Sequence, residues 1–140
     1  MYVPLHTHSD FSLLESCVKV RDLVAKAAAL GYRALALTDH NTMGGLVEFY
    51  HVCLEHKIKP IFGIELDVEG LAGCDRLVLL AADQQGYSNL LQLASHAKPC
   101  PMSKVVEYRH GLIAILSGQD AKKAIMGYHQ LAKHFANNLY

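Results

Sequence analysis

Two histidines near the start of the chain, His6 and His8, have the types and spacing that metal binding needs. The apolar residues just before them predict a short strand that ends near His8. Side chains two apart on a strand share a face, so the two imidazoles would lie about 7 Å apart along it. Asp10 would continue the same face. Two imidazoles and a carboxylate suit a divalent ion such as Zn, Mn or Fe, although a chance pair on a surface edge remains the alternative.

Three more polar residues follow short apolar segments that are predicted to be buried strands. Asp39 and His40 follow residues 34–37 after Thr38, and Glu65 lies near the end of residues 61–66. The carboxyl ends of strands gather functional groups in α/β folds, so these side chains are expected to meet the two histidines. Asp39 could instead cap the next helix, and Glu65 could face solvent. As a site residue, Glu65 could bridge two metal ions about 3.5–4 Å apart.

The hydrophobic pattern predicts alternating strands and helices along the whole chain. Short apolar runs indicate strands, and apolar residues at three- and four-residue spacing indicate helices. The first expected strand ends near His8. Four more are expected at 34–37, 61–66, 77–82 and 112–116, and a sixth begins at 139–140. The expected helices span 20–30, 46–54, 86–98, 102–108 and 119–135, and 67–75 is an expected loop. This alternation predicts a parallel α/β sheet or barrel.

Composition excludes several classes of protein. The 140 residues suffice for one domain, and 51% of them are hydrophobic, which predicts a globular fold. The 13 basic and 13 acidic residues balance, so no overall positive field would hold nucleic acid. No membrane span or secretory signal is visible, so we expect a cytoplasmic protein whose four cysteines are buried and reduced. Gly44-Gly45 is interpreted as a loop-to-helix junction rather than a phosphate site.

Several motifs together resemble the polymerase and histidinol phosphatase (PHP) family. They are His6-Thr7-His8-Ser9-Asp10, Leu37-Thr38-Asp39-His40 and Lys59-Pro60-Ile61-Phe62-Gly63-Ile64-Glu65. The flanking segments Tyr32–His40, Val47–Tyr50, Leu79–Ala82, Gly86–Leu91 and Gly111–Gly118 look like the N-terminal PHP domain of bacterial DNA polymerase III alpha subunits. The resemblance covers residues 1–140, and it implies a distorted (β/α) TIM-like barrel that binds up to three metal ions.

The resemblance also assigns residues to the site. His6, His8, Asp39, His40 and Glu65 match family metal ligands, Glu15 is a further candidate, and Asp39 and His40 are the residues expected to act in catalysis. Arg76 stands where the metal-binding pattern has a histidine, and Gln119 stands where a cysteine or histidine is expected. The late Asp-x-His ligands are missing because the chain stops at Tyr140. We therefore expect an incomplete barrel, a truncated PHP domain and a partial metal site.

Three functions follow from the resemblance as hypotheses. The first is a PHP fragment of a replicative polymerase alpha subunit, with possible phosphoesterase or 3′–5′ exonuclease activity and with DNA contacted through the rest of the polymerase. The others are a free-standing metal-dependent phosphoesterase and a non-catalytic scaffold. A guanidinium repels a metal ion but can replace its charge, so Arg76 favours the scaffold over the free-standing enzyme. An exposed sheet edge also predicts a homo-oligomer.

Overall fold

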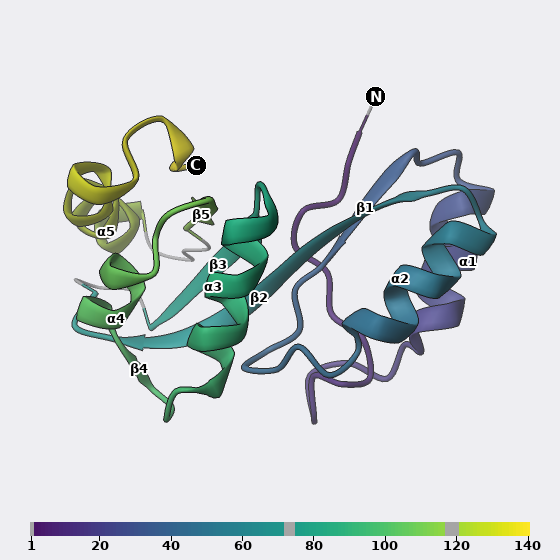
Figure 1. The fold of residues 1–140 in the computed structure, drawn as a ribbon, viewed down its shortest axis with the longest axis horizontal. Coiled ribbons are helices and arrows are strands. Elements are labelled where there is room, and N and C mark those ends of the chain that lie inside the picture. The colour runs from purple at the N-terminus through teal and green to yellow at the C-terminus, as the bar shows by residue number, and fades with distance from the viewer. Residues whose placement is uncertain (1, 72–74, 117–120) are drawn as a thin grey trace.

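The computed structural model of the chain describes residues 2–71, 75–116 and 121–140. Gln119, which the sequence analysis singled out, and Cys74, one of the four cysteines, lie outside these residues. Ten regular helices and strands follow one another in the described part of the chain (Figure 1). They are α1 (Val20–Ala29), β1 (Ala34–Leu37), α2 (Leu46–Glu55), β2 (Lys59–Glu69), β3 (Arg76–Ala81), α3 (Gln84–Ser95), β4 (Cys100–Pro101), α4 (Met102–Glu107), β5 (Leu112–Ile115) and α5 (Ala121–Phe135), after which a short 3₁₀ turn spans Ala136–Asn138.

The apolar periodicity accounts for most of these elements. In α1, Val20, Val24 and Ala27 are buried on one face, and Gly31 ends the helix with a φ of +76°. Asp83 caps α3 by accepting a hydrogen bond of 2.8 Å from the backbone N–H of Gly86. No helix in the described ranges combines the length and the apolar character that crossing a membrane requires.

The sheet is mixed, and the prediction of a parallel sheet is wrong for two of its pairings. Its strands lie in the order β1-β2-β3-β5, with β4 beside the far end of β2. β1 and β4 run parallel to β2, whereas β3 runs antiparallel to both β2 and β5. Two consecutive strands can be parallel only if a crossover of about a dozen residues or more connects them. Only residues 70–75 connect β2 to β3, so this pair is antiparallel. The expected loop at 67–75 is correspondingly shorter, because β2 continues to Glu69.

The predicted first strand does not form as a regular element. Residues 4–7 nevertheless run beside β1, where Ala36 donates a hydrogen bond to the carbonyl of Pro4 (3.0 Å) and Thr38 donates one to the carbonyl of Thr7 (2.9 Å). At the opposite side of the sheet, Tyr140 exchanges backbone hydrogen bonds of 2.9 Å with residues 114 and 116. The predicted sixth strand therefore forms only one β-bridge, in which Leu139 pairs with Ala114. The N-terminal segment thus covers the edge of β1, and the C-terminal residues cover the edge of β5. An exposed sheet edge was the reason for expecting a homo-oligomer, and these two edges are covered.

Two large hydrophobic clusters flank β2, and a third, small one contains Ala36, Val78 and Leu80. One cluster is built by α1, α2 and β1 around the fully buried Phe49, and the other by α3, α4, α5, β3 and β5 around Leu79 and Leu90. Figure 1 shows the two groups of helices on opposite sides, with β2 crossing between them. The long strand β2 is therefore the main structural connection between the two halves.

The glycine pair before α2 allows close packing. A Cβ atom added to Gly45 would lie 2.9 Å from the ring of Phe11, and one added to Gly44 would lie 3.2 Å from it. The pair therefore lets the loop after His8 lie against the start of α2, which supports the interpretation of a loop-to-helix junction. Among the described cysteines, Cys53 and Cys100 are buried as expected, but Cys17 is exposed because it belongs to this loop.

Candidate metal centre

His6, His8 and Glu65 bring their ligand atoms to one place. One nitrogen or oxygen from each side chain lies within 4.8 Å of the others. The Nε2 atoms of the two histidines are 3.2 Å apart, and each lies beside a different oxygen of Glu65, at 3.1 Å for His6 and 3.3 Å for His8. The segment that carries the histidines runs alongside β1, and Glu65 lies on β2. The expected convergence of these three residues therefore occurs, even though residues 2–8 are not a regular strand.

Glu65 is held in place by the backbone on both sides. Its N–H donates to the carbonyl of Asp39 (3.1 Å), and its carbonyl accepts from the N–H of Asn41 (2.7 Å). This parallel pairing brings the residues after β1 and the end of β2 to the same rim. Burial raises the pKa of the Glu65 carboxyl, but the hydrogen bond from His6 and the nearby positive groups outweigh burial, so its pKa lies below the usual value. Glu65 is thus a charged acceptor at neutral pH.

Arg76 lies among three carboxylates beside this group. Its Nη2 is 2.6 Å from Oε1 of Glu15, its Nη1 is 3.2 Å from Oε2 of Glu65, and its Nε is 3.5 Å from Oδ1 of Asp67. The antiparallel register places Arg76 directly opposite Asp67. The hydrogen bond from Arg76 is the largest cause of the lowered pKa of Glu15. Arg76 therefore supplies a fixed positive charge at the point where the acids converge.

His40 is enclosed by the same acids. Its Nδ1 is 3.0 Å from Glu15, and its Nε2 is 2.8 Å from Asp67. The Asn41 side chain completes this arrangement, since its amide nitrogen donates to Asp67 (2.7 Å) and its oxygen accepts from the Asp67 N–H (3.0 Å). Asn41 has a φ of +57°, a left-handed conformation that asparagine tolerates better than most residues. Both nitrogens of His40 thus have carboxylate partners.

The carboxylate of Asp39 faces Ser9 and Ser12 rather than the two histidines. Its carboxylate is buried and accepts three short hydrogen bonds, from the Ser9 N–H (2.6 Å), the Ser9 hydroxyl (2.7 Å) and the Ser12 hydroxyl (2.6 Å). Asp39 is not one of the residues whose ligand atoms converge in the described chain. Asp10, expected on the face of the two histidines, is exposed and also lies outside that group, because the chain turns at Ser9.

The centre therefore has two parts. The open part consists of His6, His8 and Glu65, and the paired part consists of Glu15, His40, Asn41, Asp67 and Arg76. Sequence reasoning missed Asp67, which it placed in a loop, and Asn41. Alternation along β2 could have found Asp67, because residues 65 and 67 of one strand share a face.

The residues of the open part fit one divalent ion. Two imidazoles and a carboxylate are a donor set that zinc accepts in catalytic sites. Across the whole centre, three carboxylates face one guanidinium, which leaves two formal negative charges with the histidines neutral. One divalent cation would balance them. In the paired part, Arg76 already contacts oxygens of Glu15 and Asp67, whereas in the open part it contacts only Oε2 of Glu65.

Comparison with known proteins places the chain in a family. A family model described as the PHP domain matches residues 4–139. The chain is 35% identical to a DNA polymerase III subunit alpha of Chlamydia trachomatis over 94% of its residues, and 33% identical to that of Vibrio cholerae over 99%. It spans only 12% and 14% of the length of these relatives. A structure from Bifidobacterium adolescentis, described as a metal-dependent phosphoesterase, shares the fold with a TM-score of 0.51 at 23% identity, covering 65% of this chain and 32% of its own. The chain belongs to the PHP domain family.

Proposed function

We propose that this chain is the PHP portion of a protein of the polymerase III alpha type, and that its centre holds one divalent ion beside a built-in arginine. The polymerase relatives support the first part of the proposal. In that context the larger protein carries out DNA-templated nucleotidyl transfer in the cytoplasm, and the mixed sheet belongs to a TIM-like barrel. The PHP portion then serves mainly as a scaffold, with at most weak phosphoesterase or 3′–5′ exonuclease activity.

The contact of Arg76 with three carboxylates carries the proposal. Glu65 has only 3% of its side chain exposed, so its charge needs a partner inside the protein. Arg76 provides that partner permanently, as a second metal ion would in a site with more ions. Two-metal hydrolysis requires two ions that stabilise the attacking and leaving oxygens together. A centre with one ion position lacks half of that arrangement.

The chain's own residues have distinct roles in this proposal. His6, His8 and Glu65 would hold the ion, which when bound would lower the pKa of a water molecule and polarise a phosphoryl oxygen. Glu15 and Asp67 fix Arg76, and His40 links these two acids. Asp39 positions the loop that carries Ser9 and Ser12. The surplus of carboxylates would repel a phosphate ester when no ion is bound, so hydrolysis depends on the metal.

Metal analysis tests the number of ions. We expect the wild-type chain, dialysed against Mn²⁺ or Zn²⁺, to retain about one ion per chain. His8→Ala should retain none, and Arg76→His should retain more than one because it replaces the built-in charge with a ligand. Arg21→His on the exposed face of α1 is the matched control and should behave like the wild type. Retention of two or more ions by the wild type contradicts the proposal.

Activity assays separate the alternative functions. A 3′-ended oligonucleotide and a small phosphate monoester would be incubated with the wild type and Arg76→His in Mn²⁺. We expect little turnover by the wild type and a gain for Arg76→His on the oligonucleotide. Efficient turnover of the small ester by the wild type would favour a free-standing phosphoesterase. Complete absence of bound metal would favour a purely structural role.

A further inference from the structure

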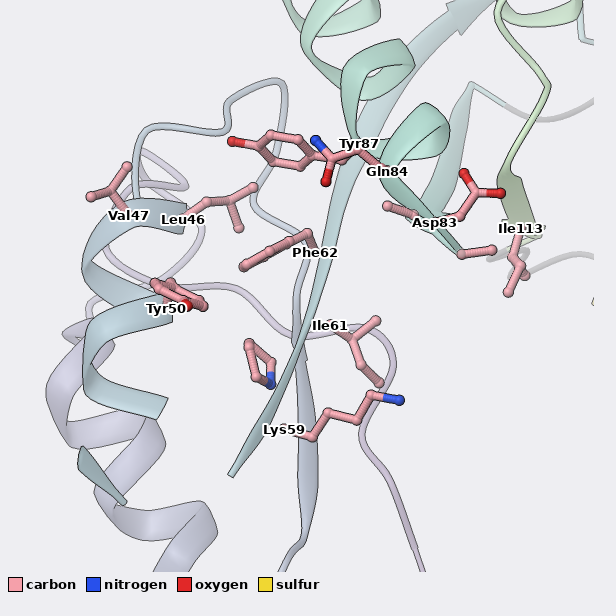
Figure 2. A pocket seen from close by; sticks show the side chains of 13 residues that line it. Leu46, Val47, Tyr50, Lys59, Ile61, Phe62, Asp83, Gln84, Tyr87 and Ile113 are labelled. Atoms are coloured by element: carbon pink, nitrogen blue, oxygen red, sulfur yellow. The ribbon is translucent and has the colours of Figure 1, made fainter. Parts of the chain in front are cut away.

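Side chains that can bind a metal ion converge at one place in the described chain. The apolar groove between α2 and α3 has a volume of about 720 Å³ and holds one acid, Asp83, but neither histidine nor cysteine among its described lining residues (Figure 2). It lies beside residues 59–62 of β2, which precede the part of β2 that pairs with β3. The converging ligand atoms belong instead to His6, His8 and Glu65. The proposed ion therefore depends on how these three side chains are held.

His8 is held at more points than His6. The Ser16 hydroxyl donates to the backbone carbonyl of His8 (3.2 Å), and Nδ1 of the His8 ring lies 3.6 Å from Oε2 of Glu15. In the described part of the chain, the polar contacts of the His6 ring are with Glu65 and His8 only. The His6 side chain is 38% exposed, against 19% for His8. Two consecutive residues, 15 and 16, thus contact the ring and the backbone of His8.

Glu15 adjoins the nitrogen of His8 that is not directed at the other ligands. Nε2 of His8 lies 3.3 Å from Oε2 of Glu65, whereas Nδ1 faces Glu15. Glu15 is not among the described residues whose ligand atoms converge. Its two oxygens are held by Arg76, at 2.6 Å from Nη2 and 3.2 Å from Nη1. Arg76 therefore fixes the Glu15 carboxylate beside Nδ1 of His8.

The chemistry of imidazole gives this contact a function. A neutral imidazole binds a metal ion through the nitrogen that lacks a proton, so the other nitrogen carries the proton. A carboxylate beside that second nitrogen favours this tautomer, restrains the ring and makes the ligand nitrogen more basic. The separation of 3.6 Å is that of an ion pair and is longer than a hydrogen bond. The attraction between Glu15 and the N–H at Nδ1 increases when Nε2 binds a cation, because the ring becomes more positive.

We propose that Glu15 is a positioning residue, which orients His8 toward the ion and does not bind the ion itself. This inference rests on the proposed centre with one ion. It replaces the role of ligand that the family resemblance implies for Glu15, and the difference follows from Arg76, whose guanidinium engages both oxygens. The same carboxylate contacts Nδ1 of His40 (3.0 Å), so Glu15 links the paired part of the centre to the open part.

Metal affinity tests the role of Glu15 on the intact chain. Binding of Zn²⁺ would be measured by competition with a chromogenic chelator, and circular dichroism would show which variants are folded. Glu15→Gln should weaken binding at least about tenfold without changing the number of ions per chain. Glu15→Asp keeps the charge but draws the carboxylate back from Nδ1 of His8. It should also weaken binding, and it provides the test if Glu15→Gln does not fold.

Two controls separate orientation of the ring from charge and from anchoring of the loop. Asp67→Asn removes an equal charge that also contacts Arg76, but Asp67 has no contact with His8, so the affinity should fall by at most about threefold. Ser12→Ala releases the same loop from Asp39 without changing Glu15, and should bind the ion like the wild type.

Nuclear magnetic resonance adds a readout that a purely structural role would not change. In the Zn²⁺-loaded wild type with isotope-labelled histidine, the proton on Nδ1 of His8 should exchange with water slowly enough to be observed. We expect its signal to disappear in Glu15→Gln and to remain in Asp67→Asn.

The possible outcomes distinguish this inference from the proposed function. Equal affinities of Glu15→Gln and Asp67→Asn, or an equal loss in Ser12→Ala, overturn the role of Glu15 and leave the centre with one ion intact. A wild type that binds two ions, one of which Glu15→Gln loses, makes Glu15 a ligand and overturns both. A wild type that binds no ion also overturns both.

Discussion

The guanidinium of Arg76 lies 2.6 Å from the carboxylate of Glu15, although these two residues are 61 positions apart in the chain. Glu15 belongs to the irregular N-terminal loop, and Arg76 begins β3. The contact therefore fastens the loop to the sheet at the metal centre. In this protein the polar cluster has a structural effect whether or not an ion is bound.

Replacing Arg76 should loosen the N-terminal loop. Arg76→Ala leaves the buried Glu65 without its fixed positive partner, so we expect a loss of about 2 kcal/mol in the free energy of unfolding, discounted for the partial exposure of Arg76. Hydrogen exchange should also speed up in residues 9–18. Arg21→Ala, whose partners Glu48 and Glu55 are exposed, should change stability by less than about 0.5 kcal/mol. If the two substitutions lowered the free energy of unfolding equally, the cluster around Arg76 would contribute nothing to stability.

The stability should fall in acid through these carboxylates. The pKa values of Glu15, Glu65 and Asp67 are lowered in the folded protein, so their stabilisation is complete above the unfolded values near 4 and is lost as the pH falls through the lower folded values. Glu15→Gln should therefore flatten the dependence of the unfolding free energy on pH between about 5 and 2. Denaturant titrations at several pH values measure this slope. Glu69→Gln, at an exposed acid outside the cluster, should leave it unchanged.

Asp39 should position the loop rather than bind the ion. Asp39→Asn weakens three charge-assisted hydrogen bonds with Ser9 and Ser12, so we expect the free energy of unfolding to fall by about 2 kcal/mol. The metal content of the folded variant should remain that of the wild type. Loss of the ion with unchanged stability would instead assign Asp39 as a ligand. Ser12→Ala removes two hydrogen bonds, the one that its hydroxyl donates to Asp39 and the one that it accepts from the His40 N–H, and should cost about 2 kcal/mol.

Gly63 should not tolerate a side chain. A Cβ atom there would lie 2.6 Å from the Leu80 side chain and 2.8 Å from the Leu79 carbonyl oxygen. Because backbone cannot move aside as a flexible side chain can, Gly63→Ala should destabilise the protein by about 3 kcal/mol. Gly44→Ala meets only movable side-chain atoms at 3.2 Å or more and should cost less. Thermal unfolding compares the two, and equal melting temperatures would contradict the packing argument.

The described cysteines should differ in reactivity. Burial raises the pKa of the Cys53 thiol to about 11, whereas Cys17 is exposed. A thiol reagent at pH 8 should therefore modify Cys17 rapidly and Cys53 only after unfolding, since the thiolate is the reactive form. Mass spectrometry of the modified peptides measures each site. Rapid modification of Cys53 in the native protein would show that the helix pair α1 and α2 opens readily.

Local sequence pattern was enough for most elements and for the core of the site. Apolar spacing predicted α1, α2 and the buried β1, because each buries a face that its own residues specify. The spacing of His6 and His8, with Glu65 at the end of a buried segment, predicted their convergence. It occurs although residues 2–8 form no regular strand, because residues 4–7 still run beside β1 and reach the same rim as Glu65. The family resemblance also identified Arg76 as a departure from the metal-binding pattern.

Only the tertiary structure decided which acids Arg76 meets and what Asp39 does. The partners of Arg76 follow from the antiparallel register of β2 and β3, which a periodic apolar pattern does not encode. Asp39 is surrounded by Ser9 and Ser12 because residues 9–12 turn back over β1, and irregular backbone has no periodic signature in sequence. The groove between α2 and α3 likewise arises from where two strands separate. Long-range pairing, rather than local propensity, set these features, since each depends on residues far apart in the chain.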